Sequence, residues 1–160
     1  MTPPAALAID LDGALGDTRR LWDDWLAEAG RVLEVDVATL PDDRCLAADL
    51  LDRAGAGNWR TLLERFAEDR APVYFRPNAE ASAALRGLEA AGVRLGVFTD
   101  APAELARIAL AQLGATRRVG MVETGTGALD RLLDELGTAT QVVRTREELA
   151  RAAAQPSART

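Results

Sequence analysis

The stretch from Ala6 to Thr18 constrains the fold of this chain more than any other. An apolar run of the length of a β-strand ends on Asp10, and Asp12 and Gly13 follow at once. Residues i and i+2 of a strand point to the same side, so the carboxylates of Asp10 and Asp12 are expected to face one place at the strand's carboxyl end. Gly13 lets the backbone turn away there. Because two carboxylates this close repel each other, a cation is expected beside them.

The same residues also fit a structural explanation, a strand followed by a solvated turn rich in aspartate. A calcium-binding EF-hand is excluded, because the invariant glycine of that loop stands at position 6 and Gly13 would stand at position 4. The choice between a turn and a site therefore depends on the rest of the chain.

Composition narrows the possible chemistry. The chain has 160 residues, a net charge of −6 and 48% hydrophobic residues, which suits one modest domain with a real core. The acidic balance argues against nucleic-acid binding. All 19 basic residues are arginines and there is no histidine, so mechanisms that use histidine or lysine are excluded.

The same composition indicates a cytoplasmic protein. No apolar run approaches the roughly 18 residues that a membrane span needs, so no membrane association is expected. The N-terminus has neither a basic region nor a cleavable apolar one, and nothing indicates export. Cys45 is the single cysteine, which excludes an internal disulfide and fits a reducing compartment.

Apolar periodicity divides the chain into a helical part and an alternating part. After a buried strand over residues 5–10, helical spacing begins at about residue 19 and includes Trp22 and Trp25, a pair expected in the core. A second amphipathic segment carries Leu46, Leu50 and Leu51, and Asn58 is expected to cap a third helix. The stretch Pro72–Pro77 is expected to be an extended hinge. The remaining expected elements are helix 78–92, strand 93–98, helix 102–113, strand 119–123, helix 127–136, strand 141–144 and a last helix that begins with a capping box at Thr145 and Glu148.

Strands that alternate with helices predict an α/β fold with a doubly wound parallel sheet. Ligands of such sheets bind at the carboxyl ends of the strands. The residues expected at those ends are Asp10, Asp12, Thr99, Glu123 and Arg144. This convergence favours a functional site over a solvated turn.

Two motifs resemble those of the haloacid dehalogenase-like (HAD) hydrolase superfamily. Ile9–Thr18 resembles its first motif, with Ala14 where threonine or valine is usual, and Val93–Pro102 resembles its second. Tyr74–Pro77, followed by Leu85, Leu88 and Gly92, is similar to the lead-in segment of the phosphoglycolate-phosphatase-like branch. The resemblance covers about residues 5–115. It implies a Rossmann-like core formed by residues 1–18 and 72–160, with a helical cap, residues 19–71, inserted after the first strand.

The resemblance also implies a chemistry. Asp10 would be the nucleophile that takes a phosphoryl group as an aspartyl-phosphate, and Asp12 would protonate the leaving oxygen and later deprotonate water. Thr99 would bind a phosphoryl oxygen, and Gly13, Asp100 and Arg144 are further candidates for the phosphate site. Mg²⁺, expected to bind weakly, would contact the Asp10 carboxylate and the Asp12 backbone carbonyl.

The other two motifs of the family are missing. The third is a lysine, whereas the matching window here is Glu123–Gly127 and the chain has no lysine. The fourth supplies metal-binding acids, whereas Val143 is followed here by Arg144, and only Glu147 and Glu148 come close. The Arg144 guanidinium is expected to contact Asp10 or Asp12, to bind a ligand phosphate, or simply to face solvent or pair with Glu147 or Glu148.

Three functions remain open. The first is a Mg²⁺-dependent phosphomonoester phosphatase with a weakened site, acting on a small phosphorylated molecule. The second is an inactive HAD-fold pseudo-enzyme that binds a phosphorylated ligand or a protein partner. The third is a nucleotide-binding protein that uses Gly125–Gly127 at a helix N-terminus, although the full dinucleotide fingerprint is absent.

Overall fold

The computed structural model describes residues 4–155. Its strands are β1 (Ala6–Asp10), β2 (Arg94–Thr99), β3 (Met121–Thr124) and β4 (Thr140–Val143). Its α-helices are α1 (Arg19–Leu33), α2 (Arg44–Arg53), α3 (Trp59–Tyr74), α4 (Ala79–Ala90), α5 (Ala103–Gln112), α6 (Ala128–Leu136) and α7 (Arg146–Ala154). Two short helical turns, η1 (Leu11–Leu15) and η2 (Val37–Thr39), complete the described part. The alternating elements expected from residue 78 onward are confirmed.

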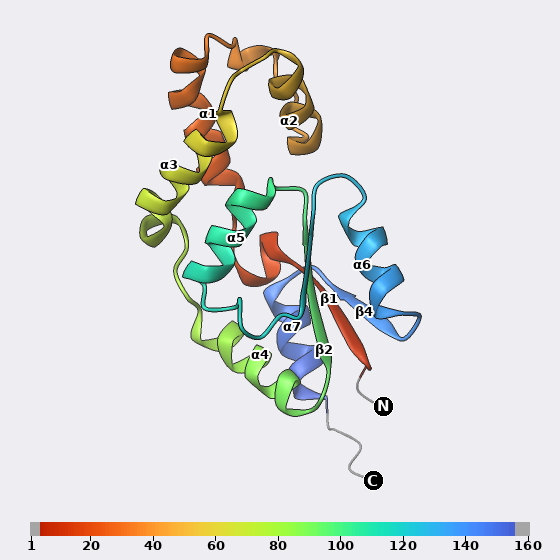
Figure 1. Ribbon diagram of the computed structural model, residues 1–160. Helices are drawn as coiled ribbons and strands as arrows, with labels where there is room; N and C mark the ends of the chain where they lie inside the picture. The colour runs from red at the N-terminus through yellow and green to blue at the C-terminus, as the bar shows by residue number, and fades with distance from the viewer. Residues whose placement is uncertain (1–3, 156–160) are drawn as a thin grey trace.

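A parallel sheet with the strand order β3-β2-β1-β4 forms the centre of the molecule (Figure 1). β1 pairs with both β2 and β4, and the register places Asp10 opposite Phe98 and Ile9 opposite Val143. Residues that follow these positions, Thr99 and Arg144, therefore lie at the same edge of the sheet as Asp10. The sheet register thus brings the expected site residues together.

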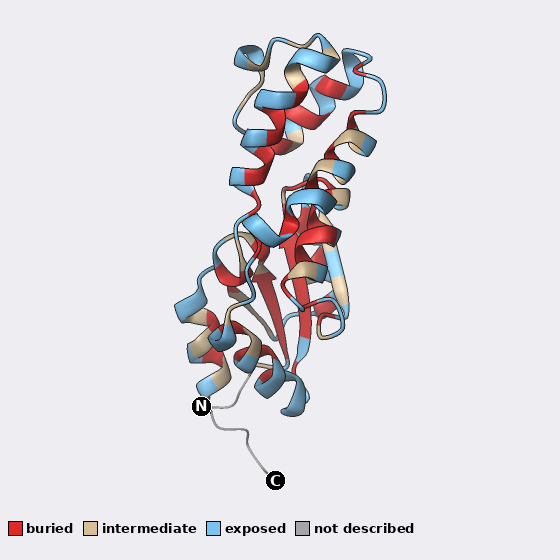
Figure 2. Ribbon diagram, turned by 90° about the vertical axis from the view of Figure 1, so that its left-hand side faces the viewer, coloured by how far each residue is buried: buried red, intermediate tan, exposed pale blue. Residues whose placement is uncertain are grey.

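Helices cover both faces of the sheet, which confirms the doubly wound α/β class. Side chains alternate along β1, so Leu7 and Ile9 join the core formed with α4, α5 and α7. Ala6 and Ala8 point to the other face and pack with Leu132 of α6. Figure 2 shows buried strands at the centre of the sheet, which are β1 and β2, whereas the edge strands β3 and β4 are mostly of intermediate exposure. Asp10 shares the side of Ala6 and Ala8, so it faces the region where α6 begins.

Helices α1, α2 and α3 lie beyond the carboxyl ends of the strands (Figure 1). Their interior holds three buried tryptophans, with Trp25 5.3 Å from Trp22 and 5.9 Å from Trp59 between ring centroids. The expected core role of Trp22 and Trp25 is thereby confirmed. One hydrophobic cluster contains these tryptophans together with Leu7 and Ile9 of the sheet. The division of the chain into a core and a cap of residues 19–71 stays a prediction.

The expected extended hinge over Pro72–Pro77 is wrong in its first half, because α3 continues through Pro72 to Tyr74. Proline removes one helical hydrogen bond and disfavours a helical residue before it. Packing of the residues on both sides of the proline compensates for the lost hydrogen bond. Ala71 and Phe75 are buried, the Phe75 amide donates to the Ala71 carbonyl at 2.8 Å, and the Tyr74 hydroxyl donates to Asp24 of α1.

Helix α2 buries a different face from the one expected. Leu46 and Leu50 are 54% and 41% exposed, so only Leu51 of the expected apolar face is in the core. The buried positions are Arg44, Ala47, Ala48 and Leu51, which recur at the i, i+3, i+4, i+7 spacing of one helical face. The face was misjudged because its first residue is an arginine and two others are small.

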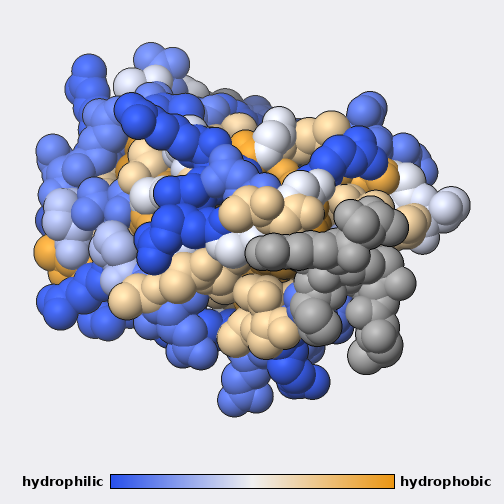
Figure 3. Space-filling view, turned by 90° about the horizontal axis from the view of Figure 1, so that it is seen from below, coloured by the Kyte–Doolittle hydropathy of each residue, from blue (hydrophilic) through white to orange (hydrophobic). Residues whose placement is uncertain are grey.

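The end of the molecule away from α1–α3 carries hydrophilic side chains around its rim and smaller hydrophobic patches nearer its centre (Figure 3). Among the described residues, no helix combines the length and the apolar character needed to cross a membrane.

Candidate active site

Asp10 is the last residue of β1, and the η1 turn folds back over it. The Asp12 amide donates to Asp10 Oδ1 at 3.1 Å, which fixes the carboxylate at the sheet edge. Burial, and then repulsion from Asp12, raises the pKa of Asp10 from 3.8 to about 6. Asp10 therefore still ionises near neutral pH, and it does so at a cost in free energy that a solvated aspartate would not have.

Asp12 is surrounded by hydrogen-bond donors. Its Oδ1 accepts from the amide of Thr18 at 2.6 Å and from the Thr18 hydroxyl at 2.7 Å. Its Oδ2 accepts from Arg44 and, at 3.4 Å, from the Thr99 hydroxyl. An ionised carboxylate has about four acceptor positions, so these bonds fill the acceptor capacity of Asp12.

Arg44 is a residue of this candidate site that the sequence analysis missed. It comes from α2, is 1% exposed, and ends between the carboxylates of Asp12 and Asp100. Nη2 donates to Asp100 Oδ1 at 2.6 Å and to Asp12, while Nη1 donates to the Thr18 hydroxyl at 2.6 Å. Nε is buried and has no partner among the described residues. Burial lowers the pKa of Arg44, but its bonds and charge pairing with Asp100 and Asp12 outweigh burial and raise it.

Asp100 contacts arginines. Besides Arg44, the Arg19 guanidinium lies 3.6 Å from Asp100 Oδ1. Burial alone would raise the pKa of Asp100, but the Arg44 hydrogen bond and the charges of Arg44 and Arg19 together lower it. Asp100 therefore binds two guanidinium groups at the site. It would support a bound phosphate by positioning these cations, and not by contacting the phosphate itself.

Arg144 lies beside Asp10, which is one of the positions that the sequence left open. Its Nη1 is 3.5 Å from Asp10 Oδ2, and the guanidinium lies 5.3 Å from the centre of the Phe98 ring. The backbone at this point is fixed, because the Arg144 amide donates to Glu148 Oε2 at 2.9 Å. The Thr145 hydroxyl accepts from the Glu148 amide at 3.1 Å, which confirms one half of the expected capping box, while the Glu148 side chain accepts from the Arg144 amide and not from the Thr145 amide.

Gly13 supports this arrangement by its size. Its φ is +107°, and a Cβ there would lie 2.6 Å from the carbonyl oxygen of Arg144. A larger residue would push the Arg144 backbone away from Asp10. The Gly13 amide, which was a candidate phosphate donor, donates to the Gly16 carbonyl at 2.8 Å.

A cavity of about 400 Å³ opens in front of Asp10. It is lined by Asp10, Arg19, Phe98, Thr99, Asp100, Gly125, Gly127, Ala128, Leu129, Asp130 and Arg144. The first residues of α6 are among them, and Gly127 before this helix provides no side-chain cap. The Ala128 amide donates to the Gly125 carbonyl at 3.3 Å and Asp130 lies in the first turn, so it is the positive end of the helix dipole that favours an anion here. A second cavity of about 220 Å³ shares Asp100 and Gly125 with the first and is lined also by Arg44.

An arginine of α6 contacts the segment Glu123–Gly127, where the family's third-motif lysine is missing. Arg131 of α6 lies 3.0 Å from Glu123 and donates to the Thr124 carbonyl at 2.6 Å and to the Thr126 carbonyl. Glu123, expected at the mouth of the site, is thereby paired. The Gly125–Gly127 turn lines the Asp10 cavity, and nothing about it identifies a nucleotide.

The described residues do not fit a divalent cation. No cluster of three histidine, cysteine, aspartate or glutamate side chains within residues 4–155 has the arrangement of a metal site. Of the two expected ligands, the Asp10 carboxylate has Arg144 at 3.5 Å, and Asp12 was expected to offer only a neutral backbone carbonyl. Of the acids near the missing fourth motif, Glu148 accepts from the Arg144 amide. Mg²⁺ favours oxygen ligands and near-octahedral geometry. The resemblance to Mg²⁺-dependent enzymes and the side chains of this chain therefore disagree.

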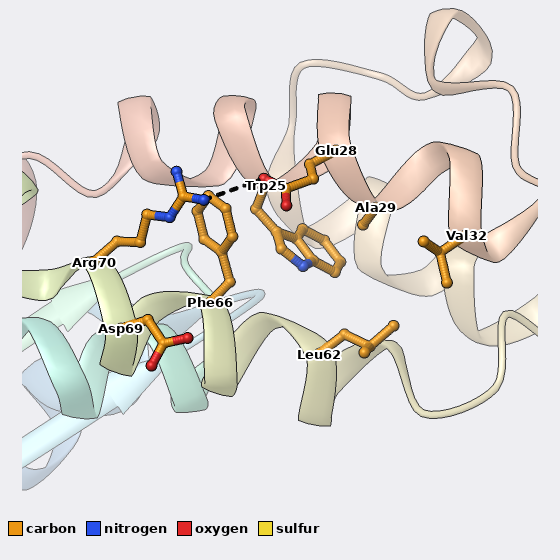
Figure 4. A pocket seen from close by; sticks show the side chains of 8 residues that line it. All are labelled: Trp25, Glu28, Ala29, Val32, Leu62, Phe66, Asp69 and Arg70. Atoms are coloured by element: carbon orange, nitrogen blue, oxygen red, sulfur yellow. Dashed lines mark ion pairs between the residues drawn. The ribbon is translucent and has the colours of Figure 1, made fainter.

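A further hollow lies between α1 and α3 (Figure 4). Trp25, Val32, Leu62 and Phe66 form its apolar lining, and the Glu28–Arg70 ion pair at 3.7 Å lies at its rim. None of the expected site residues lines it.

Comparison with known proteins gives a clear result for the fold alone. No protein-family model matches the chain, and no curated protein matches its sequence. Among solved structures, CbbY from Rhodobacter sphaeroides in complex with phosphate has a TM-score of 0.67 at 15% identity, over 94% of this chain and 83% of that one. A predicted phosphoglycolate phosphatase from Haemophilus somnus 129PT has a TM-score of 0.58 at 16% identity, over 96% and 82%. A HAD phosphatase from Thermococcus onnurineus has a TM-score of 0.56 at 17% identity, over 98% and 85%.

At these identities the likeness concerns the backbone, and the chemistry has to be argued from the residues. The sheet order, the aspartate pair after β1 and the threonine after β2 agree with the resemblance noted in the sequence. The chain therefore has the haloacid dehalogenase-like fold.

Proposed function

We propose that this protein is a slow phosphomonoester hydrolase that forms an aspartyl-phosphate on Asp10. The observation that carries the proposal is the meeting of Asp10, Asp12 and Thr99 at one sheet edge, in front of a cavity of about 400 Å³. The same cavity is lined by Arg19, Arg144 and the start of α6, which suit an oxyanion. CbbY, whose structure is similar, was solved with phosphate, which agrees with this choice of substrate class.

Asp10 would act as the nucleophile. With a pKa of about 6, it is ionised above that pH, as attack on phosphorus requires. A carboxylate oxygen forms a bond to phosphorus while the bond from phosphorus to the leaving oxygen breaks. Water then attacks the phosphorus of the aspartyl-phosphate, which releases inorganic phosphate and restores the Asp10 carboxylate.

Asp12 would move the protons, although it cannot do so in the conformation described. A general acid must carry a proton, and the acceptor positions of Asp12 are filled by Thr18, Arg44 and Thr99. Arg44 has to leave Oδ2 before Asp12 is protonated. Because Arg44 belongs to α2, that change requires α2 to move relative to β1. Turnover is then coupled to a motion of the cap, about the segment before α1 and the segment that follows the end of α3 at Tyr74.

Charge stabilisation at the phosphoryl group would come from arginines and hydrogen-bond donors. Arg144, Arg19 and Thr99 line the cavity, the Thr99 hydroxyl would have to turn from Asp12 to donate to a phosphoryl oxygen, and no lysine is available. Loss of one such preorganised stabiliser typically slows a reaction roughly 10²–10³-fold. We therefore expect weak hydrolysis.

The runner-up is a non-catalytic protein that binds a phosphorylated ligand or a protein partner. The observation that favours it is again the saturation of Asp12 by Arg44 and Thr18. Such a protein would keep the anion site and would never form a covalent intermediate.

The two alternatives differ in whether Asp10 becomes phosphorylated. The protein is mixed with acetyl phosphate, quenched in acid within seconds and examined by intact-mass spectrometry and peptide mapping. The proposal predicts a mass gain of one phosphoryl group, located on the peptide that contains Asp10 and lost on treatment with hydroxylamine. Asp134→Asn, on the exposed side of α6, serves as a control and should be labelled like the wild type. Absence of any label on Asp10 would favour the binding protein.

A further inference from the structure

The mismatch between the expected metal and the observed side chains has a specific physical basis. We propose that Arg44 and Arg144 take the place of the divalent cation, so that the Asp10–Asp12 centre binds an oxyanion without metal. This inference deepens the proposed function, because it concerns the same site, and it rests on the assignment of that site as an oxyanion centre.

The first support is the balance of charge. Three carboxylates meet here, those of Asp10, Asp12 and Asp100. Three guanidinium groups pair with them. Arg144 lies 3.5 Å from Asp10, Arg19 lies 3.6 Å from Asp100, and Arg44 contacts both Asp12 and Asp100. These guanidinium groups offset part of the repulsion between the carboxylates without a divalent cation, while burial and Asp12 still hold the pKa of Asp10 above its ordinary value.

The second support is the placement of Arg44. It is 1% exposed and spans two carboxylates, so its charge is shielded from solvent and salt. A guanidinium presents its N–H groups in a fixed fork, and it does not deprotonate in proteins. Arg44 therefore provides a permanent positive charge at Asp12 Oδ2 whenever α2 is seated on the sheet edge.

The third support is the placement of Arg144. It follows β4, where the resemblance would put metal-binding acids, and its guanidinium instead lies beside Asp10 Oδ2. Its side chain is 54% exposed and also lines the cavity, so it can contact Asp10 and a bound anion together. A cation fixed at this position repels any metal ion that approaches Asp10.

The test is calorimetric titration with tungstate, a phosphate mimic, in EDTA and again in excess MgCl₂. Wild-type protein is expected to bind tungstate with the same affinity in both, within about twofold. Arg144→Ala is expected to weaken binding in EDTA by roughly 10–100-fold, the usual worth of a charge-assisted hydrogen bond. Mg²⁺ should restore much of that loss, because the variant exposes Asp10 to the metal. Arg146→Ala removes an equal charge from an exposed site two residues away and should change nothing.

Direct titration with MgCl₂ provides a second readout. Arg144→Ala should bind Mg²⁺ at least tenfold more tightly than the wild type does. An unchanged Mg²⁺ affinity would overturn the inference, and Arg144 would then be ordinary surface charge.

The outcomes separate this inference from the proposed hydrolysis. Tungstate binding that requires Mg²⁺, or that is absent in both buffers, overturns the inference, while phosphorylation of Asp10 would still support the hydrolase. Metal-independent tungstate binding that depends on Arg144, with no phosphorylation of Asp10, upholds the inference and contradicts the hydrolase.

Discussion

Replacing Arg44 by alanine is expected to lower the free energy of unfolding by about 3–5 kcal/mol, the usual effect of removing one partner from a buried ion pair. The variant leaves Asp12 with one of its donors missing and Asp100 without its 2.6 Å partner. It also leaves the Thr18 hydroxyl without its 2.6 Å donor. Because the arginine is almost fully buried, water replaces these contacts poorly. Urea unfolding followed by circular dichroism measures the change.

Arg53→Ala is the matched control for this prediction. Arg53 lies on the same helix, is exposed, and makes none of these contacts, so its loss should change stability by less than about 0.5 kcal/mol. In a double-mutant cycle, Asp100→Asn combined with Arg44→Ala should show coupling between the two residues. Equal, small effects of Arg44→Ala and Arg53→Ala would mean that Arg44 is not the buried cation of this site.

Asp10→Asn is expected to stabilise the protein at pH 8. The native pKa of Asp10 is about 6 against 3.8 for the ordinary group, so between these pH values the native state binds more protons than the unfolded state. Stability contributed by this group therefore falls as pH rises from about 4 to about 6 and stays low above that. A rise of about two pKa units is worth about 3 kcal/mol. Asparagine keeps the shape and removes the charge.

Thermal unfolding in EDTA at several pH values measures this effect. At pH 8 the variant should melt about 6–12 °C above the wild type, and the difference should vanish near pH 4. Asp134→Asn, an exposed substitution of the same type, should show no such pH dependence. A variant that is less stable than the wild type at pH 8 would mean that Arg144 more than compensates the Asp10 charge.

The sheet and most of the candidate site could be predicted from the sequence, because the relevant information is local. Apolar runs that end on Asp10 and Thr99 mark the carboxyl ends of β1 and β2, and parallel pairing brings such ends to one edge. Arg144 was placed correctly for the same reason, since it follows β4 directly. Its exact partner depended on the side-chain conformation and stayed open.

Arg44 could not be assigned in this way, because its role depends on how α2 packs. It lies 32 residues from Asp12 and 56 from Asp100 along the chain. A signal was present in the spacing of Arg44, Ala47, Ala48 and Leu51, which marks one helical face. An arginine on the buried face of a helix needs acidic partners, and the aspartates at the sheet edge were the available ones.

At Pro72 a local rule made a wrong prediction. Local rules predict that a helix ends before a proline, and α3 continues through it because Ala71 and Phe75 are buried on either side. Tertiary packing outweighed a local preference, and that balance could not be read from the proline alone.

Hydrolysis of p-nitrophenyl phosphate by wild type and Asp10→Asn, in EDTA and in MgCl₂, tests the central claim most directly. The wild type should turn the substrate over slowly and the variant not at all, because the amide cannot accept the phosphoryl group. Equal turnover by the two proteins would contradict the assignment of Asp10 as the nucleophile.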